Sequence, residues 1–143
     1  MKLIWNSLIC LLCIPFSLAA ATNYNAEKII GSWEISDQNE TPRYRAVFIG
    51  KFNKLRMVDC KLTVDVEGKV TNAVACDLKP NKGVILEYSE RRDIYKVANP
   101  GSSISLKVDE DTMVEAGLFG FGQSVWKRSK PNTTFLFYNI DSL

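Results

Sequence analysis

Histidine is absent from all 143 residues of this chain. Its absence excludes Ser-His-Asp and Cys-His nucleophile activation, and it removes the usual proton shuttle at neutral pH and the commonest metal ligand. The sequence also contains no nucleotide-binding or hydrolase motif. It therefore predicts a non-enzymatic protein that has no catalytic residues, no cofactor and no metal site.

The chain also lacks an excess of charge of one sign. It has 18 lysines and arginines against 16 aspartates and glutamates, and one of the 18 is Lys2, which leaves 17 against 16 beyond the N-terminal leader described next. A nearly neutral chain gains little electrostatic attraction to phosphate groups. Binding to nucleic acid, or electrostatic capture by an anionic membrane, is therefore not predicted.

The first 21 residues have the order of a secretory signal peptide. A basic start at Lys2 is followed by an apolar run over residues 8–14, by a proline and by three alanines at 19–21. We expect cleavage after the last alanine, which leaves residues 22–143 as a single domain. Because Asn6, Ser7 and Pro15 interrupt the uncharged stretch from Leu3 to Ala21, we expect no stable membrane insertion. The protein is predicted to be secreted or periplasmic.

Cysteine is scarce once the leader is removed. Cys10 and Cys13 lie within the leader, and only Cys60 and Cys76 remain. Two cysteines in an exported chain predict one disulfide bond between them. A pair of small buried thiols is the alternative.

The chain has no long stretch with the 3.6-residue apolar period of a helix. It offers one helical turn over residues 26–30, with Asn25 as its cap, and then eight to ten short strands separated by turns. The short connections favour one antiparallel up-and-down β-barrel, and a β-sandwich is the alternative. The expected strands cover residues 31–36, 43–49, 55–78 (a hairpin), 84–88, 94–98, 104–108, 113–118, 123–128 and 135–138.

The hairpin over residues 55–78 has the clearest turn in the sequence. Its tip, from Asp65 to Lys69, has the composition of a three-residue loop in which Gly68 takes the left-handed conformation. That loop pairs Asp65 with Lys69. The pairing fixes the register of the strand ends next to the turn.

The same register conflicts with the expected disulfide. It places Cys60 opposite Val74, whereas a disulfide requires Cys60 to lie opposite Cys76. We therefore expect a β-bulge near residues 72–73 that shifts the register by two residues and allows the bond to form.

A short motif at the first strand resembles the G-x-W opening of lipocalins. It reads Gly31-Ser32-Trp33 and follows the helical turn. In lipocalins an arginine near the last strand covers this tryptophan, and Arg128 in Trp126-Lys127-Arg128 is the matching candidate for barrel closure. The resemblance implies an eight-stranded barrel that holds a small apolar ligand. The same two motifs, G-x-W at the first strand and W-x-R near the last, also resemble those of small uncharacterised bacterial periplasmic proteins. That resemblance implies a fold and no activity.

Large side chains on the apolar faces of the strands are the candidates for lining such a cavity. Along residues 43–49 the apolar side chains alternate with two arginines, which we expect on the outside. The rings near residues 118–122 alternate with glycines; they would line the barrel or, if exposed, form a patch for a partner. The ligand-lining candidates are Trp33, Tyr44, Phe48, Leu62, Val64, Phe119 and Phe121.

Two functions are compatible with these features. The first is binding of a small apolar molecule inside the barrel. The second is binding of a protein partner, as an inhibitor or an envelope assembly factor, through a strand edge or through loops at residues 37–42, 89–93 and 99–103. Asn39 and Asn132 match the N-glycosylation acceptor pattern in predicted loops.

Overall fold

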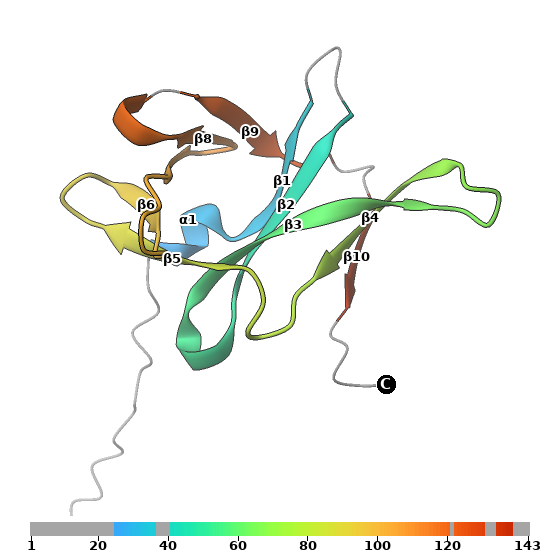
Figure 1. Cartoon of the computed structure of the whole chain (residues 1–143), viewed down its shortest axis with the longest axis horizontal. Helices are drawn as coiled ribbons and strands as arrows, with labels where there is room; N and C mark the ends of the chain where they lie inside the picture. The colour runs from blue at the N-terminus through green and yellow to red at the C-terminus, as the bar shows by residue number, and fades with distance from the viewer. Residues whose placement is uncertain (1–24, 37–40, 121, 131–133, 139–143) are drawn as a thin grey trace, which may run out of the picture.

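A computed structural model of the protein describes residues 25–36, 41–120, 122–130 and 134–138 (Figure 1). The predicted all-β class with one N-terminal helical turn is confirmed. The leader, Asn39, Phe121 and Asn132 lie outside the described residues. The elements are α1 (Ala26–Ile29), β1 (Gly31–Ile35), β2 (Arg43–Ile49), η1 (Lys51–Asn53), β3 (Leu55–Val64), β4 (Val70–Asp77), β5 (Val84–Ser89), β6 (Ile94–Val97), β7 (Ser105–Asp109), β8 (Thr112–Ala116), η2 (Leu118–Gly120), β9 (Ser124–Arg128) and β10 (Thr134–Tyr138).

Eight of the strands close into an antiparallel barrel, as the sequence predicted. Going around it, the order is β1, β2, β3, β5, β6, β7, β8 and β9, and the pairing of β9 with β1 completes the ring. Pairing between sequence neighbours, which the short connections favoured, fails at two points: β5 pairs with β3 and skips β4, and β10 pairs with β4 and not with β9. No described helix has the length and apolarity needed to cross a bilayer.

The long strand β3 belongs to two sheets. Its first half, at Arg56 and Met57, pairs with β5, and its second half, from Lys61 to Val64, pairs with β4. A close approach at Gly83, which has φ +75°, allows the first pairing, since a Cβ there would lie 2.2 Å from the Met57 carbonyl oxygen. β10 adds to β4 in parallel. We call β4 and β10 the flap.

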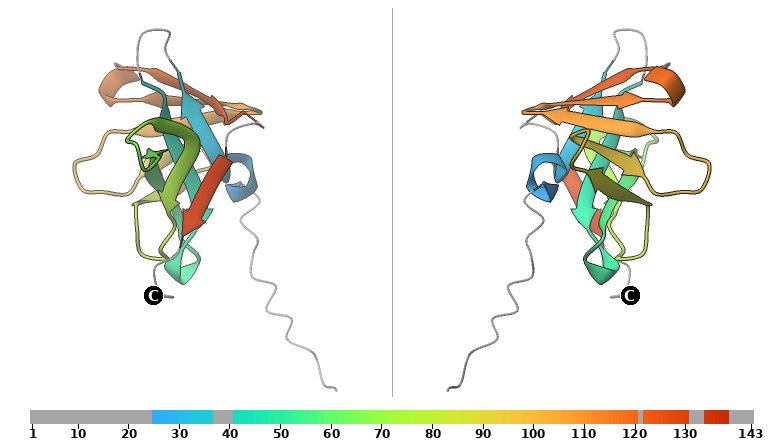
Figure 2. Two further views of the ribbon diagram at one scale, coloured as in Figure 1. Left: turned by 90° about the vertical axis from the view of Figure 1, so that its right-hand side faces the viewer. Right: turned by 90° about the vertical axis from the view of Figure 1, so that its left-hand side faces the viewer.

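The flap curls over the outer face of β2 and β3. In Figure 2 (left) it lies in front of these two strands. The Tyr44 and Phe135 rings meet edge to face there, with centroids 6.0 Å apart.

The flap and the barrel together produce two apolar clusters. The barrel interior is filled by Ala26, Ile29, Trp33, Val47, Leu55, Met57, Leu86, Tyr95, Val97, Leu106, Met113 and Trp126. The outer cluster, beneath the flap, contains Tyr44, Ala46, Phe48, Val58, Cys60, Leu62, Val74, Cys76, Leu78 and Phe135.

The inside and outside of β2 are therefore reversed relative to the prediction. Tyr44 and Phe48 were expected to line the barrel, and they pack beneath the flap instead. The opposite face, which carries Arg45 and Val47, points inward, because Arg45 pairs with the buried Trp33 of β1 and paired residues share a face. Alternation on β2 showed which residues share a face, but β2 has an apolar cluster on each side.

The predicted hairpin loop and disulfide are confirmed. Gly68 has φ +80°, and the Asp65 amide donates to the Lys69 carbonyl at 2.9 Å. The register shifts between the pair Val64 with Val70 and the pair Leu62 with Val74. The extra residues lie on β4 around 72–73, where the bulge was expected. The shift brings the Cys60 and Cys76 Cα atoms to 4.5 Å, joined by the disulfide.

Candidate functional site

One end of the barrel is closed by Trp33 and Arg128. The Arg128 guanidinium lies 4.2 Å from the centroid of the Trp33 ring. It also donates hydrogen bonds to the carbonyl oxygens of Lys28 at 2.6 Å and Ile30 at 2.7 Å, at the end of α1. The Trp33 indole donates to the Ile29 carbonyl at 2.9 Å. Helix, tryptophan and arginine together form a plug, which we call the closed end.

The glycine of the G-x-W motif makes room for this plug. Gly31 has φ +135°, and a Cβ on it would lie 2.6 Å from Nη1 of Arg128. Any larger residue at this position would displace the guanidinium. Burial lowers the pKa of Arg128, while Asp111, whose carboxylate is 3.7 Å away, acts in the opposite direction.

Tyrosines complete the polar contacts of the closed end. The Tyr95 hydroxyl donates to the Asn25 carbonyl oxygen, and burial raises the pKa of Tyr95 to about 12. Asn25 occupies the N-cap position of α1, but its side chain makes no capping bond, so the predicted side-chain cap is wrong. Tyr88 donates to Asp93 at 2.6 Å, and this hydrogen bond raises the pKa of Tyr88. Both tyrosine hydroxyls at this end thus have a specific acceptor.

The opposite end, which we call the open end, contains a cavity of about 490 Å³. It lies where β3 diverges from β5 to join the flap. Its apolar walls are formed by Met57, Val84, Val97 and Ile104, and its polar lining includes Arg45, Asp59, Asp77, Asn99, Ser102 and Glu115. The site therefore combines an apolar wall with a group of charges.

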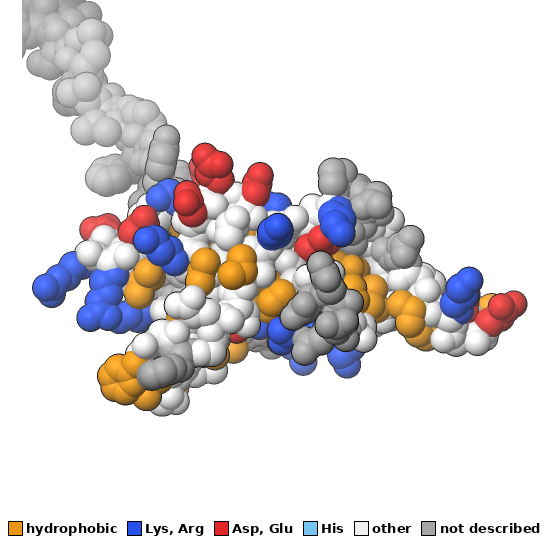
Figure 3. Space-filling view, turned by 90° about the horizontal axis from the view of Figure 1, so that it is seen from above, with side chains coloured by type: hydrophobic (Ala, Val, Ile, Leu, Met, Phe, Trp, Pro, Cys, Tyr) orange, Lys and Arg blue, Asp and Glu red, His pale blue; other side chains and the backbone are white. Residues whose placement is uncertain are grey.

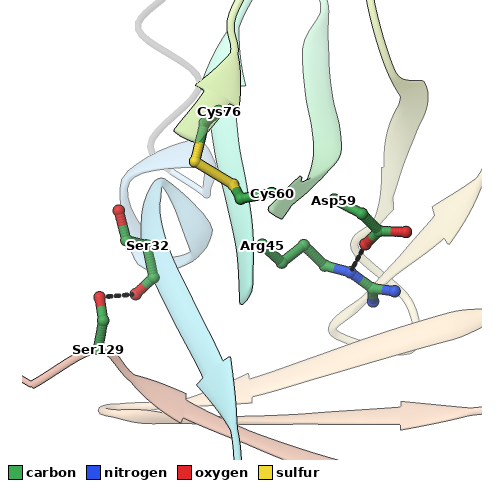
Figure 4. Close-up of a disulfide and its surroundings, with 6 residues drawn as sticks. All are labelled: Ser32, Arg45, Asp59, Cys60, Cys76 and Ser129. Atoms are coloured by element: carbon green, nitrogen blue, oxygen red, sulfur yellow. Dashed lines mark hydrogen bonds and ion pairs between the residues drawn. A yellow bond between two sulfur atoms is a disulfide. The ribbon is translucent and has the colours of Figure 1, made fainter. Parts of the chain in front are cut away.

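Arg45 is the central charge of this site. Its guanidinium lies 4.1 Å from the centroid of the Trp126 ring, and its Nε donates to Asp59 Oδ1 at 2.7 Å (Figure 4). Its Nη1 pairs with the Glu115 carboxylate. Because Glu115 pairs across the sheet with the buried Leu106, that carboxylate also faces inward. An arginine expected on the outside thus separates the filled core from the cavity.

The disulfide lies beside the cavity. Cys60 follows Asp59 and Cys76 precedes Asp77, and both aspartates line the cavity. The bond therefore holds β3 and the flap together where both contribute carboxylates to the site. Figure 4 shows the bond together with Asp59. In the same view Ser129 donates to the Ser32 carbonyl at 3.0 Å and fastens the end of β9 to β1.

None of the six described ligand-lining candidates borders this cavity. Trp33 is part of the plug, and Phe119 is exposed beyond β8. Three candidates, Tyr44, Phe48 and Leu62, lie in the outer cluster. Val64 is exposed on the hairpin, and Phe121 lies outside the described residues.

The residues that sequence reasoning missed are Arg45, Asp59 and Glu115. Asp59 and Glu115 lie 14 and 70 residues from Arg45 along the chain, so no local pattern joins them. The only signal in the sequence was the apolar alternation of β2, which was assigned to the wrong side of the sheet.

The closed antiparallel barrel with a short N-terminal helix is consistent with a lipocalin-like fold. Comparison of the chain with protein-family models, curated proteins and solved structures finds no match in any of the three.

Proposed function

We propose that the protein is an exported, non-enzymatic binding protein that holds a small apolar ligand in the cavity at its open end. The observation that carries this proposal is the cavity itself. Its volume of about 490 Å³ falls within the range of about 300–1,000 Å³ typical of ligand pockets. The leader and the disulfide support export, because such bonds persist in oxidising compartments.

The charges of the cavity favour a ligand with one polar end. Asp59, Asp77 and Glu115 line it together with two cations, Arg45 and Lys82. Arg45 is already paired with two of these carboxylates. An anionic head group would add to an excess of negative charge, so the ligand is neutral or carries a hydrogen-bond donor that the exposed Asp59 can accept.

A neutral dye tests the cavity directly. We expect Nile red to bind the protein and to lose its binding in Ile104→Trp, because the indole would fill space between the apolar walls. Val64→Trp places the same bulk on the exposed hairpin, away from the cavity, and should leave dye binding unchanged. Absence of dye binding, or equal loss in both variants, would contradict the proposal. Native mass spectrometry of protein purified from its own source would then identify the ligand.

A second candidate function is binding of a protein partner through the β3–β4 hairpin. The hairpin projects from the barrel (Figure 1), and Val64, Val66 and Val70 are exposed on it. Exposed apolar residues on one element are typical of a contact surface. Val66→Asp should abolish recovery of a stoichiometric partner from the source extract while dye binding persists. Recovery of no partner by the unmodified protein would exclude this function.

A further inference from the structure

The two ends of the barrel differ in the charge of their connections. The closed-end connections at residues 50–54, 90–93 and 109–111 contain nine charged residues. Two open-end connections, residues 98–104 and 117–123, contain none. The third open-end connection, residues 36–42, contains two acidic residues and lies mostly outside the described part of the chain.

The two uncharged connections lie side by side and expose apolar side chains. Ser105 pairs with Ala116, which brings the loops before β7 and after β8 together. Ile104, Leu118 and Phe119 are exposed there, Phe119 to 86%. Hydrophobic side chains gather at the corresponding projecting edge at the lower left of Figure 3. We call this group the rim; one of its members, Ile104, also lines the cavity.

The backbone of the rim holds Phe119 outward. Phe119 has φ +56°, in the left-handed region that is uncommon for aromatic residues, and Gly120 follows with φ +78°. The turn is therefore a strained conformation that presents a large ring to solvent. Burial within the barrel, which the sequence predicted for Phe119, is not observed.

Phe52 at the closed end is the natural comparison for Phe119, because it is also exposed but lies in a charged connection. It is exposed to 80% and also has a left-handed backbone, with φ +59°. The Lys51 ammonium, however, lies 5.0 Å from the centroid of its ring. Two phenylalanines with similar exposure and backbone conformation thus differ in their surroundings: Phe52 lies beside a lysine, and Phe119 lies in a loop without charged residues.

We propose that the rim docks the open end onto the surface of a neutral lipid bilayer, with Leu118 and Phe119 entering the interface. Insertion at the acyl boundary of a neutral bilayer requires apolar area, and a charged side chain carried into the acyl region costs free energy; these two loops offer exposed apolar side chains and carry no charge. A protein partner would gain little orientation from a surface without charged groups. With two main side chains entering, the contact is weak and reversible.

This docking would give the cavity access to apolar molecules. If the proposed ligand binding holds, a ligand would pass between bilayer and cavity across the rim without crossing water. The docking itself does not depend on that ligand, and its test contains none. Failure of one proposal therefore leaves the other standing.

Tryptophan fluorescence in vesicles tests the rim. The chain beginning at Thr22 contains every described element and only two tryptophans, Trp33 and Trp126, both buried. In Phe119→Trp we expect the new indole to be quenched by brominated phosphatidylcholine vesicles. The matched variant Phe52→Trp should not be quenched. Equal quenching of both variants, or of neither, would overturn the proposal.

Binding measurements on serine variants complete the test. Phe119→Ser should weaken sedimentation with phosphatidylcholine vesicles at least about tenfold, since a large apolar side chain no longer leaves water. Phe52→Ser should bind as the unmodified protein does. Binding should be insensitive to salt, because the rim has no cation to be screened. Conversion of a dimer to a monomer by Phe119→Ser, with no vesicle binding, would show a contact between two copies instead and overturn the proposal.

Discussion

The two ends of this barrel are built from the same strands but differ in how their side chains are packed. At the closed end, Trp33 is completely buried, and Arg128 satisfies two carbonyl oxygens next to α1. At the open end, a cavity remains unfilled, and Leu118 and Phe119 face solvent. The plug thus joins β1 and β9, the two strands that close the barrel, whereas the open end combines a cavity with exposed apolar side chains. The following predictions test that division.

Among these substitutions, removal of the plug should lower the free energy of unfolding most. Trp33→Ala deletes a fully buried side chain that holds both Arg128 and the end of α1. We expect the free energy of unfolding to fall by about 3–5 kcal/mol, measured by urea denaturation. Phe52→Ala, an exposed ring, serves as the control and should cost little. Similar losses in the two variants would contradict a stabilising plug.

Loss of the disulfide should be the largest effect at the open end. The bond closes a loop with a sequence separation of 16, for which the expected stabilisation is about 3 kcal/mol. Replacing Cys60 and Cys76 together by serine should lower the free energy of unfolding by that amount. Because the bond holds two cavity aspartates in place, Nile red binding should weaken as well. Unchanged dye binding in folded variant protein would show that the flap is held without it.

The raised pKa of Tyr95 at the closed end should make the free energy of unfolding fall above pH 10. Below pH 10 its hydroxyl is protonated in both states, and stability is unaffected. Between pH 10 and the folded pKa of about 12, only the unfolded chain ionises, so unfolding becomes easier with rising pH, by about 2 kcal/mol at pH 12.

Tyr95→Phe isolates this contribution. The variant should show a shallower loss of stability above pH 10 in chemical denaturation at several pH values. The loss should not vanish, because the pKa values of Tyr44 and Tyr88 are raised too. An unchanged pH dependence would exclude Tyr95 as the cause.

The two buried tryptophans offer a finer comparison of the ends. The Trp33 indole donates to Ile29, whereas the Trp126 indole, beneath Arg45, has no hydrogen-bond partner among the described residues. Trp33→Phe should therefore destabilise the protein by about 1 kcal/mol more than Trp126→Phe, measured by denaturation. Equal costs would indicate that solvent pairs with the Trp126 indole.

Changes at the rim should have the smallest effect on stability. Leu118 is exposed, and Leu118→Ser should change the free energy of unfolding by no more than about 0.5 kcal/mol. The same substitution of the buried Leu106 should cost several times as much. A large loss in Leu118→Ser would mean that the rim supports the fold.

Features set by neighbouring residues could be predicted from the sequence. The strand bounds, the loop at Gly68 and the G-x-W opening with Arg128 all depend on local patterns or on a known motif. The bulge near residues 72–73 was predictable because the turn and the disulfide demanded different registers of one hairpin. Each of these constraints involves few residues.

The candidate site could not be predicted in the same way. Its floor requires Arg45 to face inward, and the burial of that charge is tolerated because Asp59 and Glu115 converge on it from other strands. The cavity forms where β3 separates from β5, so its shape depends on the pairing of β5 with β3 and not with β4. Neither condition is visible along a single strand.

By itself the sequence determined an all-β chain, its turns, its disulfide and the residues that share each face, because backbone alternation and turn chemistry act over a few residues. Only the tertiary structure decided which of those faces points inward. β2 has an apolar cluster on both sides, and the flap, by covering Tyr44 and Phe48 from outside, turned the Arg45 face toward the barrel and its cavity.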